Sequence, residues 1–520
     1  MTLYDLLAHS ATDKAERTAL VYRGQAMTYA ELRAAVEGFA SGLTNLGAGK
    51  ALRIGLLLPN CPAFVIAYVG GSRVGSVVPI NVLYRPDEVR HILADCRADA
   101  LVTAEPFRPL VEAVRPHLPK LRHIVMVSDG GCQDGELDFR SLCAPPLLPP
   151  LPRGGKGGCD LPPRTDKDVA VILYTSGTTG RPKGAMLTHR NLLANATSCA
   201  QVLPVGPDDR FLSALPLFHS FAATVFMILP ILAGGSIHLV ERFLPAHTLA
   251  MLEQTEATVF GGVPSMFALM VQHPPSQRPK LSRLQIAISG GAPLPPEVWR
   301  EFEQAFDAKL VEGYGLTEAS PVVAVNPPMG LRKPGSVGQP LPGVRVRIVD
   351  EGRCEVARGE VGELLVRGDN VMKGYLGLPE DTRSAIRAGW LGTGDLARID
   401  EDGYLYIMGR KKELIIVGGL NVYPGEVERV LVEHPAVVEA AAFGVDDAAR
   451  GEAVWAAVTL QPDKSVSQRD LLAFCRGKLA SFKVPRGVEI VDQLPKNALG
   501  KVMRHVLREQ VASGFRCAAT

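Results

Sequence analysis

The middle of the chain reads Val169-Ala-Val-Ile-Leu-Tyr-Thr175 and continues directly as Ser176-Gly-Thr-Thr-Gly-Arg-Pro-Lys-Gly184. The first run is uncharged and rich in β-forming residues, which indicates a central strand covered on both faces. The second run consists mainly of glycines and hydroxyl side chains, with one lysine near its end. Glycine lets the backbone approach an anion closely, hydroxyls add donors, and Lys183 adds a positive charge. The pattern therefore predicts a loop that holds a polyphosphate.

The flanking sequence fits phosphate binding, although the loop is not of the Walker A type. Thr188-His-Arg-Asn191 predicts the start of a helix, so a strand, a loop and a helix would follow one another, a common setting for phosphates. A Walker A loop needs Ser or Thr after its lysine, whereas Gly184 follows Lys183. A flexible surface turn is the plain alternative, but an unbroken run of Ser, Thr and Gly from 175 to 180 is unusual for a turn.

Further toward the N-terminus, helix-like and strand-like segments alternate, which predicts an α/β fold. Thr28-Tyr-Ala-Glu31 is a capping box followed by apolar residues at helical spacing, and Leu52–Leu58 is a compact apolar run that indicates a buried strand. The stretch from Gly130 to Asp166 is rich in Gly and Pro, and we expect it to be a surface connection.

A second break falls near Gly409, and the tail beyond it predicts a small α+β domain. Pro424–Glu433 and Ser467–Leu479 are expected to be helices, and Glu439–Val445 and Val454–Leu460 are expected to be strands. The predicted fold class is α/β, with a large N-terminal domain of layered α/β subdomains over residues 1–410 and a small C-terminal domain over residues 411–520.

Composition limits the class of protein. The 56 basic and 54 acidic residues nearly cancel, so electrostatics gives no reason to expect nucleic acid as a partner. Nine scattered cysteines form no CxxC pair, which argues against a zinc site or a disulfide framework and favours the reducing cytoplasm. The N-terminus does not have the pattern of a secretory signal.

One segment raises the question of a membrane span. Residues 211–240 carry no Asp, Glu, Lys or Arg, but prolines and glycines interrupt them. The densest apolar part, Phe221–Leu232, is short for a span of about 20 residues. We therefore expect this segment in the protein core, with a membrane anchor as a rival hypothesis.

Five motifs together resemble the adenylate-forming superfamily, which includes acyl-CoA synthetases, peptide-synthetase adenylation domains and luciferases. They fall in the family's order and span most of the chain. They are Tyr174–Gly184, Glu312-Gly-Tyr-Gly-Leu-Thr-Glu318, Trp390-Leu-Gly-Thr-Gly-Asp395, Gly409-Arg-Lys-Lys412 and Pro495-Lys-Asn-Ala-Leu-Gly-Lys501. The resemblance implies that the small domain rotates on a hinge, with Lys412 at the pivot.

The resemblance also implies where ATP and coenzyme A bind. The loop would surround the β- and γ-phosphates, Tyr314 would stack on adenine, and Asp395 would accept hydrogen bonds from the ribose hydroxyls. Gly418 and Gly419 would line the tunnel for the pantetheine arm of coenzyme A. The implied binding residues are Thr175, Ser176, Gly177, Thr178, Thr179, Gly180, Lys183, Gly291, Ala292, Pro293, Glu312, Gly313, Tyr314, Gly315, Asp395, Arg410, Lys412, Gly418 and Gly419.

Four residues are implied in catalysis. Thr317 would contact the α-phosphate, and Glu318 would hold Mg²⁺, a hard cation that prefers carboxylate and phosphate oxygens. Lys501 would bridge the attacking carboxylate and the α-phosphate, where a fixed charge stabilises the transition state. His219 would orient the carboxylate at the mouth of the acyl pocket; a histidine buried in the core is its plain alternative.

The acyl pocket is expected to be uncharged, which disfavours an amino acid or a dicarboxylate as substrate. Its expected wall consists of Phe221, Val225, Gly262, Ser289, Gly291, Gly315 and Pro321. The motif context, including Asn370-Val-Met-Lys-Gly-Tyr375, resembles bacterial ligases for medium- and long-chain fatty acids. We therefore expect an ATP-dependent acyl-CoA ligase that forms an acyl-AMP intermediate.

Several alternatives stay open at this point. The acid could be aromatic, the acceptor could be an acyl carrier protein, or the chain could be a non-catalytic fatty-acid-binding relative. The expected partners are a carboxylic acid, ATP and coenzyme A, without nucleic acid or a transmembrane span. Peripheral contact with a membrane and homodimer formation are left open.

Overall fold

The computed structural model describes residues 1–46, 52–144, 163–175, 182–447, 450–496 and 502–512. The chain forms two compact units. The first comprises Met1–Val346 and Val366–Leu391, and the second comprises Arg347–Leu365 and Gly392–Thr520. The expected α/β fold with a large N-terminal part and a smaller C-terminal part is confirmed.

A nine-stranded sheet in the first unit has a parallel centre. The neighbours from β14 to β1 are parallel, and antiparallel strands close both ends. In spatial order the strands are β16 (Gln339–Pro340), β15 (Val322–Val325), β14 (Lys309–Gly315), β13 (Ile286–Ser289), β12 (Val259–Gly262), β10 (Arg210–Ser213), β11 (Ser236–Leu239), β1 (Thr18–Tyr22) and β2 (Gln25–Thr28).

An eight-stranded sheet in the same unit contains the predicted central strand as β8. The strands from β8 to β7 are parallel, and β9 and β19 extend the sheet in antiparallel pairing. In spatial order the strands are β19 (Gly374–Tyr375), β9 (Lys183–Thr188), β8 (Val169–Thr175), β4 (Gly75–Pro79), β3 (Leu52–Leu57), β5 (Ala100–Ala104), β6 (His123–Val127) and β7 (Glu136–Asp138).

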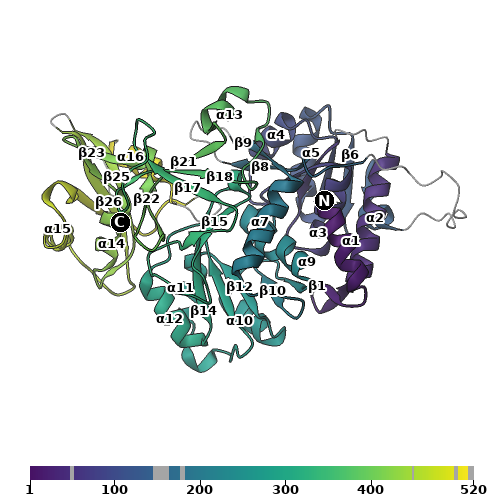
Figure 1. The fold of residues 1–520 in the computed structure, drawn as a ribbon, viewed down its shortest axis with the longest axis horizontal. Helices are drawn as coiled ribbons and strands as arrows, with labels where there is room; N and C mark the ends of the chain where they lie inside the picture. Colours follow the sequence, from purple (N-terminus) through teal and green to yellow (C-terminus); the bar gives the residue numbers. More distant parts are fainter. Residues whose placement is uncertain (47–51, 145–162, 176–181, 448–449, 497–501, 513–520) are drawn as a thin grey trace, which may run out of the picture. The chain divides into compact units, whose positions relative to one another are not determined.

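One layer of helices is shared by the two sheets (Figure 1). α3 contacts β3, β4 and β8, whereas α2 contacts β1 and β2, and the two helices pack on each other. The layer consists of α1 (Leu3–Asp13), α2 (Tyr29–Asn45), α3 (Pro62–Val74), α7 (His189–Val202) and α9 (Leu229–Ala233). Both sheets therefore bury an apolar face against the same helices.

The α2 helix shows how local sequence sets this layer. Thr28 caps it, and Glu31 completes the predicted capping box. The apolar residues expected on one face, including Leu32 and Phe39, are fully buried.

Further helices cover the outer faces of the sheets. α4 (Pro86–Asp95) and α5 (Arg108–Val114) bury apolar residues against the eight-stranded sheet. The nine-stranded sheet is covered by α10 (Pro245–Gln254), α11 (Pro264–Gln272) and α12 (Pro296–Phe306). Phe267 on α11 packs edge-on against Phe260 and Phe302, which joins strand and helices through aromatic contacts.

Two expectations about connections are wrong. The stretch from 130 to 166 is not only a surface connection, since β7 pairs with β6 and α6 (Phe139–Cys143) packs on α2. A Cβ atom on Gly38 of α2 would lie 2.2 Å from the Cys143 carbonyl oxygen, so glycine permits this close packing. The phosphate loop also does not lead directly into a helix, because Lys183 begins β9. The helix predicted from Thr188 is confirmed as α7, which follows this strand with Thr188 as its N-cap.

The uncharged segment 211–240 lies in the core, as expected. It contains β10, α8 (Ser220–Ala223), a π-helical turn over Thr224–Ile228, α9 and β11. Most of its apolar side chains are buried. Among the residues that the structure describes, no helix has both the length and the apolar character needed to span a membrane.

The second unit contains the predicted α+β tail. β23 (Ile415–Val417), β24 (Leu420–Val422), β25 (Val437–Asp447), β26 (Gly451–Leu460) and β27 (Gly487–Ile490) form one sheet. One face packs against α14 (Pro424–Val432) and α15 (Gln468–Arg476), and the other packs against α16 (Arg504–Ala512). The unit also contains β22 (Leu405–Arg410), which pairs with β21 (Trp390–Ile399).

Candidate active site

Predicted site residues meet at one edge of the nine-stranded sheet, where the parallel strands β12, β13 and β14 end. Gly262 is in register with Ser289, and Ser289 is in register with Glu312. Ligands of open α/β sheets commonly bind at the carboxyl ends of the strands. Three residues that the sequence assigned to the acyl pocket and the nucleotide site therefore lie side by side.

Beyond β13, the predicted adenine turn follows directly. Gly291, Ala292 and Pro293 are exposed, and Gly291 has a φ of 85°, a conformation that favours glycine. Tyr314 and Gly313 are half-buried on the neighbouring strand β14. A flat ligand therefore has access both to the backbone of this turn and to an aromatic side chain.

Glu312 lies beneath this turn and is nearly completely buried. Its Oε1 accepts a hydrogen bond of 2.9 Å from the backbone N–H of Leu294. Burial raises the pKa of the Glu312 carboxyl to about 8. Glu312 therefore supports the turn as a largely neutral acid near pH 7.

His219 and Thr317 belong to neighbouring segments. His219 caps α8, and its Nδ1 accepts a hydrogen bond from the backbone N–H of Phe221 at 3.4 Å. The next residue, Ser220, has its Oγ 3.4 Å from Thr317 Oγ1. The structure thus brings the predicted carboxylate-orienting residue next to the predicted α-phosphate contact, and Ser220 is a polar link that the sequence did not identify.

Glu318 lies beside the end of β8. Its Oε1 accepts hydrogen bonds from Thr175 Oγ1 at 3.2 Å and from the Tyr375 hydroxyl at 3.0 Å. No described residue donates a hydrogen bond to the other carboxylate oxygen, Oε2. The predicted metal-holding residue therefore lies beside the predicted phosphate loop.

Lys183 pairs with an acid that the sequence did not identify. Its Nζ lies 2.8 Å from Asp381 Oδ1 and 5.6 Å from the centre of the Tyr375 ring. Asp381 lies on α13 (Pro379–Ala385), directly after β19. Tyr375 belongs to the stretch Asn370–Tyr375, which contributed only to the family resemblance. No sequence pattern predicted a role for Tyr375 or Asp381.

The expected acyl pocket wall consists of uncharged residues. The Phe221 ring packs edge-on against Phe226, and a Cβ atom on Gly290 would lie 3.4 Å from the Phe221 ring. Val225 and Pro321 are buried. A Cβ atom on Gly315 would lie 2.1 Å from the Pro321 carbonyl oxygen, so the close packing of the backbone by itself requires glycine at this position.

The second unit contains the remaining described site residues. Arg410 and Asp395 are cross-strand neighbours on β22 and β21, and Arg410 Nε lies 2.8 Å from Asp395 Oδ1. Lys412 is exposed in the short turn after β22. Gly418 and Gly419 form the two-residue loop between β23 and β24, with φ values of 57° and 82°.

Six predicted residues fall outside the described parts of the chain. They are Ser176, Gly177, Thr178, Thr179, Gly180 and Lys501. Their roles stay predictions.

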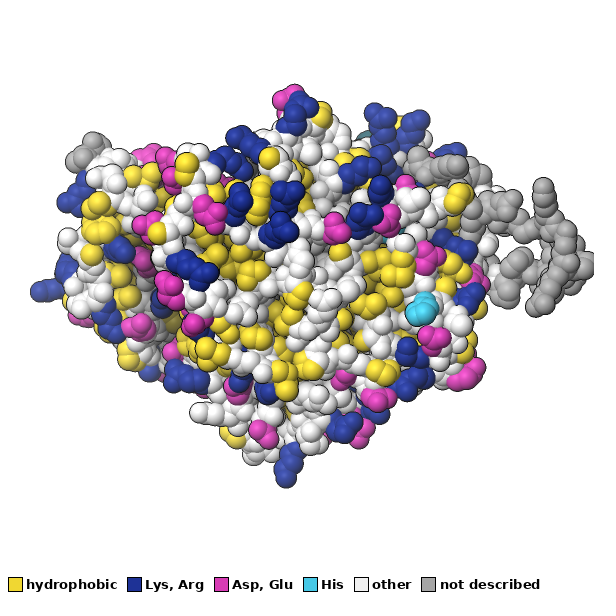
Figure 2. Space-filling model, in the orientation of Figure 1, with side chains coloured by type: hydrophobic (Ala, Val, Ile, Leu, Met, Phe, Trp, Pro, Cys, Tyr) yellow, Lys and Arg dark blue, Asp and Glu magenta, His cyan; other side chains and the backbone are white. Residues whose placement is uncertain are grey.

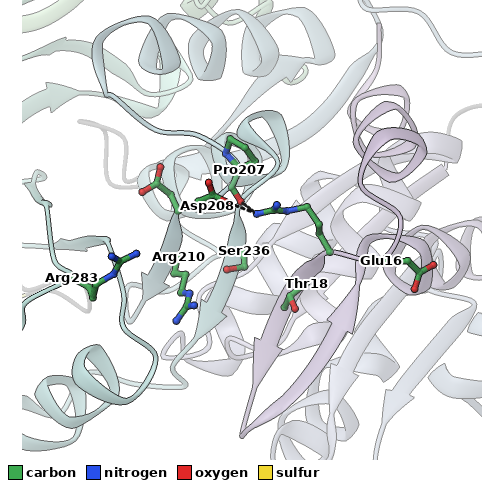
Figure 3. Close-up of a pocket in the computed structure, with 9 residues that line it drawn as sticks. Glu16, Thr18, Pro207, Asp208, Arg210, Ser236 and Arg283 are labelled. Atoms are coloured by element: carbon green, nitrogen blue, oxygen red, sulfur yellow. Dashed lines mark hydrogen bonds and ion pairs between the residues drawn. The ribbon is translucent and has the colours of Figure 1, made fainter.

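A separate cavity of about 580 Å³ lies at the opposite edge of the nine-stranded sheet (Figure 3). Its lining comes from the residues that precede or begin β1, β10 and β11, together with Arg283. Arg17 pairs with Asp208 at 2.7 Å across it, and Arg210 pairs with Glu256 at 2.7 Å. Because strand starts and strand ends lie at opposite edges, this cavity is distinct from the predicted nucleotide site.

The surface is in line with the balanced composition. Basic and acidic side chains both occur across the face shown in Figure 2. Among the described residues, no group of three or more His, Cys, Asp or Glu side chains could hold a metal ion.

Comparison with known proteins identifies the family. The model of the AMP-binding enzymes matches residues 7–376, and the model of the AMP-binding enzyme C-terminal domain matches residues 426–501. The chain belongs to the family of AMP-binding enzymes. The resemblance to adenylate-forming enzymes, and among them to acyl-CoA synthetases, is thereby confirmed.

Two curated relatives are similar along almost the whole chain. A long-chain-fatty-acid–CoA ligase of Bacillus subtilis (strain 168) is 37% identical over 98% of this chain and 94% of its own. A feruloyl-CoA synthase of an Amycolatopsis species is 37% identical over 95% of this chain and 96% of its own.

Two solved structures have the same fold. ATP-bound MatB from Rhodopseudomonas palustris has a TM-score of 0.88 and 33% identity, covering 98% of this chain and 99% of its own. The anthranilate CoA ligase AuaEII, in complex with anthranoyl-AMP, has a TM-score of 0.89 and 30% identity, covering 99% and 98%.

Proposed function

We propose that the protein is an ATP-dependent acyl-CoA ligase whose acid is a medium- or long-chain fatty acid. The carboxylate oxygen attacks the α-phosphorus of ATP, and pyrophosphate leaves with the bridging oxygen. The sulfur of coenzyme A then attacks the acyl carbon, the thiol proton is lost, and AMP leaves. The relatives support this reaction class, because two are named CoA ligase or CoA synthase and one neighbour holds an acyl-AMP.

One observation carries the proposal: Ser220 and Thr317 lie with their hydroxyl oxygens 3.4 Å apart. Adenylation requires the carboxylate and the α-phosphate to meet within bonding reach. Since His219 precedes Ser220 and Glu318 follows Thr317, the groups proposed for the acid and for the phosphate flank this contact.

In this reaction His219 orients the carboxylate as a neutral donor. Burial lowers the pKa of the His219 imidazole, which favours the uncharged ring. Because Nδ1 accepts a hydrogen bond from Phe221, the ring proton belongs on Nε2, where it is available to a carboxylate.

The described residues fit a magnesium ion held through ATP. Mg²⁺ is usually bound by one or two carboxylates together with substrate phosphates and water. Glu318 supplies one carboxylate, and its Oε2 receives no hydrogen bond from a described residue. Bound Mg²⁺ would neutralise phosphate charge as pyrophosphate leaves.

Lys501 is the proposed catalytic cation for adenylation, and the small domain would withdraw it before the thiol enters. We expect Lys501→Ala to lose pyrophosphate release from ATP and acid while it still converts supplied acyl-AMP to the thioester. Lys496→Ala is the matched control, because Lys496 belongs to the same motif but pairs with Glu439 at 2.6 Å. Normal pyrophosphate release by the Lys501 variant would overturn this assignment.

The fatty-acid assignment rests on the uncharged wall that includes Phe221, Val225, Gly262, Ser289 and Pro321. A hydrocarbon chain loses little by entering such a site, whereas a second carboxylate would be buried unpaired. ATP–pyrophosphate exchange over acids from C2 to C18 and aromatic acids, with and without coenzyme A, separates the choice of acid from that of acceptor. A rate maximum at C8 or longer supports the proposal, and a maximum at a dicarboxylate contradicts it.

The aromatic-acid ligase is the second candidate. It is favoured by the feruloyl and anthranilate acids named for two similar proteins. The edge-on pair of Phe221 and Phe226 could pack against a ring as well as against a chain. In the same panel, exchange that is fastest with an aromatic acid would favour this candidate.

Further expectations complete the proposal. We propose a hinge between the domains 1–410 and 411–520, whereas the second compact unit comprises Arg347–Leu365 and Gly392–Thr520. We also propose a cytoplasmic location, since the seven described cysteines are free thiols. Gel filtration with light scattering tests the homodimer, and vesicle flotation tests peripheral membrane contact.

A further inference from the structure

A short segment of the first unit, Gly374–Thr382, reaches two charged residues of the proposed ATP site. It begins as β19, in which Gly374 and Tyr375 pair with Met186 and Ala185 of β9. The backbone N–H of Tyr375 donates to Thr382 Oγ1 at 2.9 Å, and this hydroxyl donates to the Leu378 carbonyl at 2.8 Å. The position of Tyr375 is therefore held from both sides.

The hydroxyl of Tyr375 acts on one oxygen of Glu318. It donates to Oε1 at 3.0 Å, and Thr175 Oγ1 donates to the same oxygen at 3.2 Å. Two donors on one oxygen restrict rotation of the carboxylate, and Oε2 receives no hydrogen bond from a described residue.

We propose that Tyr375 is a positioning residue for the divalent cation that binds with ATP: its hydroxyl fixes Oε1 of Glu318 so that Oε2 is presented to the cation. This inference rests on the proposed role of Glu318. Partners that orient a metal-binding carboxylate typically change metal affinity by about 10- to 100-fold when they are removed.

The test measures how strongly the cation and ATP assist each other's binding. The dissociation constant of ATP is measured by calorimetry without acid substrate, once in EDTA and once in Mg²⁺. The constant in EDTA divided by the constant in Mg²⁺ is then compared between each variant and the wild type. For Tyr375→Phe we expect this ratio to fall by about tenfold, with binding in EDTA unchanged. A purely structural tyrosine would instead change both constants or only the unfolding temperature.

Tyr22→Phe is the matched control, because the Tyr22 hydroxyl also donates to a glutamate, Glu241, at 2.6 Å. Tyr22 lies on β1 of the nine-stranded sheet, whereas β19 belongs to the eight-stranded sheet. We expect its ratio to equal that of the wild type. Thr382→Val serves as a second variant, because it removes the hydrogen bond to the Tyr375 backbone N–H and keeps the Tyr375 phenol. We expect its ratio to lie between those of the wild type and Tyr375→Phe.

Glu318→Gln separates failure of the inference from failure of the proposed function. If the ratio falls in this variant and equals the wild-type ratio in Tyr375→Phe, the positioning role is overturned and the role of Glu318 stands. If Glu318→Gln keeps the ratio, both assignments are overturned. Loss in both variants, together with an unchanged Tyr22→Phe, supports the inference.

Discussion

Arg410 and Asp395, both predicted to contact the nucleotide, form an ion pair in which Arg410 Nε lies 2.8 Å from Asp395 Oδ1. They face each other across β21 and β22, and Asp395 is almost fully buried. A buried carboxylate held by a guanidinium is fixed in orientation, which suits a group that accepts hydrogen bonds from two hydroxyls. Arg410 is therefore expected to act on ribose through Asp395 as well as directly.

This pair predicts unequal effects of two substitutions. Arg410→Gln should weaken ATP binding about tenfold or more and also lower stability by roughly 1–3 kcal/mol, because it leaves a buried carboxylate without its cation. Arg398→Gln on β21, the strand that carries Asp395, should leave ATP affinity nearly unchanged, because its guanidinium lies over the Tyr406 ring. Calorimetry with ATP and urea unfolding check both effects; equal ATP affinities of the two variants would argue against the assignment.

The ion pair between Lys183 and Asp381 predicts a gain in affinity. In its proposed contact with the phosphates, Lys183 would have to leave Asp381 or share its charge with that residue. Because Asp381 is partly exposed, the pair is worth at most about 1 kcal/mol, so Asp381→Asn should tighten ATP binding by roughly two- to fivefold. Asp208→Asn, which removes a similar pair with Arg17, is the control. Weaker binding by the Asp381 variant would mean that Asp381 supports Lys183 in its bound position.

Glu312 predicts a pH-dependent term in stability. The folded state keeps its proton up to about pH 8, whereas the unfolded chain releases it near the ordinary pKa of 4.5. Between these values the folded state binds more protons, so the free energy of unfolding decreases as the pH rises. Glu312→Gln keeps an acceptor for Leu294 without this charge, so its stability relative to the wild type should increase from pH 5 to pH 9 by on the order of a few kcal/mol. A stability difference independent of pH in urea unfolding would contradict this.

The hairpin between β23 and β24 predicts a selective loss of the thiol step. Its two glycines have positive φ values, which the turn geometry itself requires. Replacing either glycine would therefore strain the loop and could not serve as a specific test of coenzyme A binding. The neighbouring Leu420 is half exposed and has ordinary strand geometry. Leu420→Trp should therefore slow thioester formation from acyl-AMP at least tenfold, while ATP–pyrophosphate exchange stays near the wild-type rate. The exposed Val438→Trp on β25 is the control.

Local patterns predicted much of the fold, because they depend on neighbours in sequence. The run Val169–Thr175 is a strand with these bounds, and Ser467 caps α15 as expected. The antiparallel strand β9 was missed because a Gly- and Pro-rich loop followed by a capping signal also fits a strand–loop–helix unit. The short β7 was missed because its pairing with β6 is a long-range contact that no local period reveals.

The parts of the candidate site that belong to a sequence motif were predictable. The parts that depend on long-range contacts were not. Glu318 and Thr317 stood in a recognisable run, and both lie beside partners suited to their proposed roles. Tyr375 and Asp381 are distant in sequence from Glu318 and Lys183, and long-range contacts such as the pairing of β19 with β9 bring them together. The raised pKa of Glu312 depends on burial, which the sequence of its motif did not indicate.

The helices between the two sheets of the first unit also limit how the gene can be divided. Each sheet uses α2 and α3, or the helices packed on them, to keep water from its inner face. A fragment that ends between the sheets would expose a broad apolar surface and would be prone to self-association. Split versions of this enzyme, made for reporter or assembly purposes, should therefore be cut outside the first unit and outside the sheet β23–β27, for example in the turn between β22 and β23.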